Sequence, residues 1–203
     1  MASKPRLSPR KQPLQERSRE TVAVILEAAA RILEEQGFEG YNTNAVAERG
    51  GVSVGSVYQY FPNKDAMTLA LIARFENEIV EAVHTAAVAS EGKDLRTSLK
   101  LLVGGLLQAH EGRANLNRIL ETEEARLRPA SSETSAALHL KKSIASLLAQ
   151  RTGELGTRVD AAAIDDIIVI TRAMVDDALQ KDVSRSVASR RILRAIEGYL
   201  RWK

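Results

Sequence analysis

Apolar residues recur along this chain with a spacing of three or four positions rather than in alternation with polar ones. Proline occurs only at Pro5, Pro9, Pro13, Pro62 and Pro129, so the runs between are long and unbroken. A period near 3.6 residues with few prolines is typical of α-helices. The pattern predicts an all-α protein with about nine helices.

The first part of the chain predicts one longer helix followed by two short ones. The first helix should end at Gly37, because glycine readily adopts the left-handed conformation that follows a helix. Thr43 and Ser53 suit the N-caps of two short helices, and the glycines at 50–51 allow a tight turn between them. Two short helices joined in this way form a helix-turn-helix, whose second helix enters the DNA major groove.

A much longer helix is predicted next, capped by Asn63 and running to about Val88. Five further helical patterns follow it. We therefore divide the chain into a basic disordered arm, a helix-turn-helix DNA-binding domain and a larger helical domain, at 1–16, 17–64 and 65–203. The five later helices are expected at about 94–111, 115–128, 132–151, 160–180 and 185–202.

The net charge of +3 is unevenly distributed along the sequence. Residues 1–20 hold six Lys and Arg against two acids, and residues 181–203 hold seven against two. A basic arm that contains prolines is usually disordered, and it either keeps the chain solvated or contacts polyanions. Charge alone leaves both interpretations of the arm open.

Several classes of protein are disfavoured by what the sequence lacks. It contains no cysteine, so disulfides and thiolate metal sites are excluded, which fits a reducing cytoplasm. No apolar run is long enough for a membrane span or a signal peptide. The three histidines are far apart, and no phosphate loop or nucleophile elbow occurs. We expect a soluble cytoplasmic protein that is not an enzyme and holds no metal or cofactor.

The segment TNAVAERGGVSVGSVYQYFPNKD, residues 43–65, carries a specific resemblance. Over about 18–70 the chain is similar to the DNA-binding signature of the TetR family. Nearly every position of that signature is occupied here by a matching residue. The resemblance implies phosphate or backbone contacts by Thr43, Asn44, Tyr58 and Lys64. It also implies that the outward positions of the third helix read the groove, namely Val54, Gly55, Ser56, Gln59 and Tyr60, beside Ser53 at its start.

Each of these residues has an ordinary structural alternative. Tyr58 could be a core aromatic, Lys64 an exposed lysine that opposes the helix dipole, and Gln59 a surface amide. Among the arm residues, Arg17 and Arg19 are best placed to contact phosphates or the minor groove.

A single reading helix makes too few contacts for useful specificity, so a homodimer on two half-sites is expected. The resemblance implies that the last two helices pair with their symmetry mates. Their apolar faces are also what an ordinary core needs, and that interpretation must be partly true. The candidate dimer residues are Ile164, Ile168, Thr171, Val175, Ile192, Ile196 and Tyr199.

The resemblance further implies a small-molecule effector, held between the long helix and those that follow. Only Tyr199 and Trp202 among the aromatics lie beyond Phe75, so a pocket within 76–180 cannot be aromatic-lined. Gly104-Gly105 would either open space in a helix or allow close packing.

The function predicted is a sequence-specific regulator of transcription, a repressor that releases a palindromic operator when its effector binds. One alternative is an enzyme that carries this DNA-binding domain. The other is a DNA-binding regulator or architectural protein without an effector.

Overall fold

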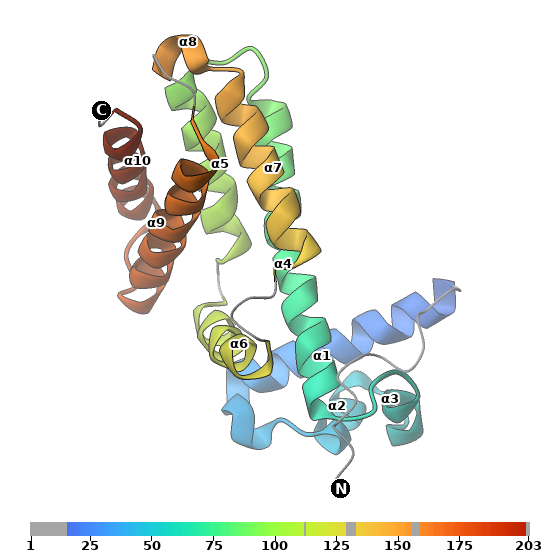
Figure 1. Ribbon diagram of the computed structural model, residues 1–203. Coiled ribbons are helices and arrows are strands. Elements are labelled where there is room, and N and C mark those ends of the chain that lie inside the picture. Colours follow the sequence, from blue (N-terminus) through green and yellow to red (C-terminus); the bar gives the residue numbers. More distant parts are fainter. Residues whose placement is uncertain (1–15, 112, 129–132, 156–158, 202–203) are drawn as a thin grey trace, which may run out of the picture. The chain divides into compact units, whose positions relative to one another are not determined.

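The computed structural model describes residues 16–111, 113–128, 133–155 and 159–201, and within these ranges it contains helices and turns but no strand. The all-α prediction is confirmed. Of the predicted arm, only Glu16 belongs to the described residues. The described ranges hold ten helices, one more than expected (Figure 1): α1 Glu16–Gly40, α2 Thr43–Gly50, α3 Val54–Tyr60, α4 Lys64–Ala89, α5 Leu95–Ala109, α6 Ala114–Leu127, α7 Ser135–Ala149, α8 Thr152–Leu155, α9 Ala161–Gln180 and α10 Arg185–Arg201.

The local signals at the ends of the first helices act largely as predicted. Gly37 has a φ of 67° and interrupts α1 where the helix was expected to end. Ser53 caps α3 by accepting a hydrogen bond from the Ser56 amide. At α2 the prediction was wrong by one residue, because the cap is Asn42, whose carbonyl Oδ1 accepts from two following amides, while Thr43 is already helical.

The helices group into two compact units, which we call the N-terminal and C-terminal units. The N-terminal unit contains α1, α2, α3, α6 and α4 as far as Phe75. Its core includes Ile25, Val57, Phe61 and Leu116, so α6 shares a core with α1 and α3 although 53 residues lie between the end of α3 and the start of α6. The domain boundary predicted between residues 64 and 65 concerns parts of the chain that fold independently. It stays a prediction.

The C-terminal unit contains the rest of α4, from Glu76, with α5 and α7 to α10. The hydrophobic side chains buried in its core are all aliphatic among the described residues. Within it α9 and α10 lie side by side, and α10 also contacts α5 (Figure 1). None of the helices in the described ranges is long and apolar enough to cross a membrane.

The two adjacent glycines of α5 have different surroundings. A Cβ added to Gly105 would lie 3.3 Å from the carbonyl oxygen of Ala82 in α4, whereas one added to Gly104 would meet nothing within 4 Å. Close helix packing therefore accounts for Gly105, and it does not account for Gly104.

Candidate nucleic-acid interface

The third helix has one face in the core and one in solvent. Val57 is completely buried, and Phe61, which follows the helix, is also buried. Val54 and Tyr58 are exposed, at 39% and 43%, and Gln59 is exposed as well. The exposed side of α3 therefore presents a methyl-bearing side chain, a phenol and an amide.

Tyr60 does not lie on that exposed side. Its side chain is 7% exposed, because it comes three residues after Val57 and so shares the inner face of the helix. Its hydroxyl lies 3.1 Å from Ser18 Oγ, which links the end of α3 to the first turns of α1. The prediction that Tyr60 faces outward is therefore wrong, and the partner Ser18 gave no signal in the sequence.

Tyr58 connects the two helices of the helix-turn-helix. Its hydroxyl lies 3.1 Å from Thr43 Oγ1 in the first turn of α2, and neither residue is buried. Asn44, the next residue of α2, is exposed. Two hydroxyls and an amide side chain are thus gathered at the positive end of the α2 dipole, the kind of group that contacts phosphate oxygens.

The start of α3 is open and built from small groups. Ser53 Oγ and Ser56 Oγ are 2.8 Å apart, and Ser53 is exposed while Ser56 is half-buried. A Cβ on Gly55 would meet only Ser53 Oγ, at 3.7 Å. Packing within the chain therefore does not require glycine at this exposed position.

Lys64 is held by the protein itself. Its Nζ donates to the carbonyl of Phe38 at 3.1 Å and lies 3.5 Å from the centroid of the Phe38 ring. Burial lowers the pKa of the ammonium, and the nearby carboxylates Glu123 and Asp65 partly offset that effect. A hydrogen bond and a cation–π contact fix this side chain, so its role includes packing as well as any contact with phosphate.

Arg17, the remaining residue of the predicted DNA contacts, is exposed in the first turn of α1. Its backbone carbonyl accepts a hydrogen bond from Thr21 Oγ1. Among the described residues, the structure records no hydrogen bond from its guanidinium group. The side chain of Arg17 faces solvent.

The predicted dimer residues lie mostly inside the chain. Ile192 and Ile196 have no exposed surface, so neither side chain can bury further surface when two chains associate. Ile164, Thr171 and Val175 are also buried in the C-terminal unit. These five serve the core of their own chain. Ile192 and Ile196 have no surface left for a partner, which corrects the prediction for those two, whereas a partner contact by Ile164, Thr171 or Val175 stays a prediction. The remaining two, Ile168 and Tyr199, are half-buried, and the Tyr199 hydroxyl donates to Asp166.

In the described part of the chain, no group of three or more His, Asp or Glu side chains is arranged to hold a metal ion.

Comparison with known proteins agrees with this geometry. Residues 25–71 match the model of the family described as bacterial regulatory proteins, tetR family. The chain is 35% identical over 94 residues to the HTH-type transcriptional repressor KstR of Mycolicibacterium smegmatis, covering 46% of this chain and 45% of that one. It is 30% identical over 129 residues to the nucleoid occlusion factor SlmA of Haemophilus ducreyi, covering 59% and 60%. The chain thus spans about half the length of these curated relatives.

Solved structures extend the likeness over most of the chain. A TetR-family regulator of Marinobacter aquaeolei VT8 superposes with a TM-score of 0.64 at 20% identity, covering 89% of this chain and 97% of that one. One from Streptomyces coelicolor has a TM-score of 0.57 at 25% identity, covering 89% and 99%. Residues 25–71 are thus similar to the DNA-binding region of the TetR family of bacterial regulatory proteins, and the helices that follow share the fold of solved structures from that family.

Proposed function

We propose that this protein is a transcription regulator that binds a palindromic operator as a homodimer and represses transcription from it. The observation that carries the proposal is the exposed face of α3, with Tyr58 hydrogen-bonded to Thr43 at the start of α2. This arrangement places phosphate-binding groups directly beside side chains that can reach base edges.

The proposed DNA contacts are of two kinds: some hold the phosphate backbone and position the protein, and others recognise the bases. Tyr58, Thr43 and Asn44 hold the phosphate backbone, and Lys64 and Arg17 add positive charge. Gln59 reads a base through its amide, and Val54 packs against an apolar edge such as a thymine methyl group. The open surroundings of Gly55 let the backbone of α3 approach the groove.

A dimer is supported by the charges of the last two helices. Helix α9 holds four aspartates against one arginine, and α10 holds five arginines against one glutamate. Val169 of α9 is 66% exposed, and Arg190 and Arg194 of α10 are exposed too. Some of this charge is already paired within the chain, since Asp165 contacts Lys141 and Asp177 contacts Arg191. In a twofold dimer the partner would therefore cover Val169 and the exposed arginines of α10.

Release of the operator by an effector is the finer part of the proposal. Helix α4 is continuous and contributes to both units, so a ligand that prefers one placement of this helix would change DNA affinity. The aliphatic core of the C-terminal unit favours an effector without flat aromatic rings. The relative KstR is named a repressor.

A second candidate function is favoured by the other relative. SlmA is named a nucleoid occlusion factor, which is a different role from repression. On this alternative the chain binds DNA without a small-molecule effector.

The test is selection of genomic fragments bound by the full chain, followed by binding measurements on the selected site. Tyr58→Ala should weaken binding several-fold on every sequence, because it removes phosphate contacts worth about 1 kcal/mol. Gln59→Ala should change the preferred base instead. Arg118→Ala, an exposed arginine of α6, is the control. Unchanged binding by folded Tyr58→Ala would refute the mapping, and selection without a palindrome would favour the second candidate.

A further inference from the structure

A groove of about 480 Å³ opens on the N-terminal unit among α1, the end of α2 and α4. Its floor is apolar and includes Val24, Ala28 and Gly50. A Cβ on Gly50 would lie 3.5 Å from both Ala28 and Val24, so α1 and α2 meet closely there. Val24 is nevertheless 44% exposed, which leaves apolar surface open within the groove.

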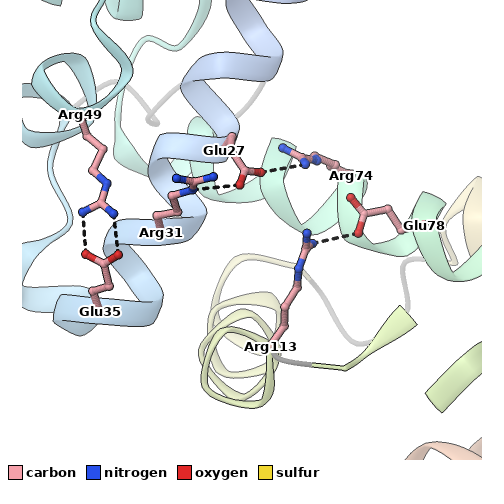
Figure 2. Close-up of polar contacts among 7 residues, drawn as sticks. All are labelled: Glu27, Arg31, Glu35, Arg49, Arg74, Glu78 and Arg113. Atoms are coloured by element: carbon pink, nitrogen blue, oxygen red, sulfur yellow. Dashed lines mark hydrogen bonds and ion pairs between the residues drawn. The ribbon is translucent and has the colours of Figure 1, made fainter. Parts of the chain in front are cut away.

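Three arginines, one from each of these helices, also line the groove. Figure 2 shows their contacts with Glu27 and Glu35. Arg31 Nε and Arg74 Nη2 each donate to the Glu27 carboxylate at 3.1 Å. Arg49 forms a two-pronged pair with Glu35, at 2.6 Å and 2.5 Å. The five side chains carry three positive and two negative charges, so the rim has an excess of positive charge.

The geometry points to a binding site for a small organic anion with an aliphatic body, of the class of medium-chain carboxylates. The arginine rim would receive the carboxylate, and the exposed apolar surface of Ala23 and Val24 would contact the alkyl chain. The volume lies within the range of small-molecule sites, about 300–1,000 Å³. The proposal concerns the unliganded N-terminal unit and does not depend on operator binding.

Glu27 already shows that this rim accepts a carboxylate. Its two oxygens bridge two guanidiniums from different helices, as an incoming anion would. Partial burial raises the pKa of Glu27, but Arg31 and Arg74 outweigh that effect and hold it below its ordinary value. Glu27 therefore competes with an external carboxylate, and its removal should strengthen binding.

The experiment is a titration of the full chain, without DNA, with sodium octanoate, followed by amide chemical shifts. We expect saturable shifts centred on Val24, Ala28 and Gly50. Octanol, which lacks the charge, and inorganic phosphate, which lacks the alkyl chain, should bind at least tenfold more weakly, since the site needs both parts. Shifts elsewhere only, or equal binding of phosphate, would overturn the proposal.

Two pairs of variants locate the site. Val24→Glu should weaken octanoate binding at least tenfold by placing a carboxylate on the floor, whereas Val88→Glu, at an exposed valine of α4, should not. Glu27→Gln should tighten binding several-fold, whereas Glu91→Gln, with the same change in net charge, should not. The proposal fails if each variant behaves like its control, and because no DNA is present, that failure is separate from failure of the proposed function.

Discussion

At the scale of single residues, helical geometry decides which side chains of α3 are exposed. Tyr58 and Tyr60 are only two positions apart, yet one is exposed and the other buried, because successive residues of a helix are rotated by about 100°. Position 58 follows the core residue Val57 directly and turns outward. Position 60 lies about one turn after Val57, so its side chain points inward as that of Val57 does.

The two tyrosines should therefore respond differently to loss of the hydroxyl group. Tyr60→Phe removes the hydrogen bond to Ser18 in a partly buried setting and should lower the free energy of unfolding by about 1 kcal/mol. Tyr58→Phe removes an exposed hydrogen bond to Thr43 and should have little effect on stability. Urea denaturation measures both. An equal cost for the two variants would contradict the assignment of Tyr60 to the inner face.

At the scale of helices, capping side chains fix where elements begin. Asn42, Ser53, Asp94 and Asp160 each accept a hydrogen bond from an amide in the first turn of the next helix. Such residues can be found in a sequence, although Asn42 and Thr43 are both good caps and the choice between them depends on the backbone of the loop before them. The starts of α2, α3, α5 and α9, which these caps mark, were predicted to within one residue, whereas α7 was expected at 132–151 and is Ser135–Ala149.

Asp94, the N-cap of α5, should make the free energy of unfolding depend on pH in the acid range. Hydrogen bonds from the Thr97 amide and hydroxyl hold its pKa below the ordinary value of 3.8. Because the folded pKa is the lower one, its stabilisation is complete above about pH 4 and is lost as the pH falls through the folded pKa. Urea midpoints should fall less steeply with acid in Asp94→Asn than in the unchanged protein. Asp94→Ala should lower the midpoint at neutral pH as well, and an unchanged slope in Asp94→Asn would contradict this linkage.

The paired glycines of α5 provide a second test at this scale. Gly104→Ala should stabilise the protein by up to about 1 kcal/mol, since alanine favours the helix and its Cβ enters open space. Gly105→Ala should gain less or destabilise, because the Ala82 carbonyl must move. Thermal unfolding compares the two variants. A larger gain from Gly105→Ala would show that the approach of α5 to α4 is looser than described.

At the scale of the whole molecule, most apolar residues of α9 and α10 serve the core of their own chain. Ile192 and Ile196 are completely covered, so the surface left for a partner is the opposite side of these helices. That side carries Val169 among acidic residues on α9 and several arginines on α10. In the proposed homodimer, this side of the two helices would supply a small apolar contact at Val169 and charged groups around it.

Val169→Lys tests this arrangement. A lysine at the contact would be desolvated and would face the arginines of the partner's α10. The variant dimer should therefore dissociate at a higher protein concentration than the unchanged one. Val88→Lys, at an exposed valine of α4, should leave association unchanged. Sedimentation velocity over a range of concentrations measures both. Equal dissociation constants for the two variants would place the dimer contact elsewhere.

The sequence by itself determined the helical class, the helix-turn-helix and the exposed face of α3 up to Gln59. These features follow from local rules of spacing, capping and turn geometry, which act within a few residues. Tertiary structure decided that α6 shares the core of the N-terminal unit, that Tyr60 is hydrogen-bonded to Ser18, and that Lys64 contacts Phe38. It also decided which apolar residues of α9 and α10 the chain covers for itself. Each of these depends on residues far apart in the chain, whose meeting is set by how the helices pack rather than by any local pattern.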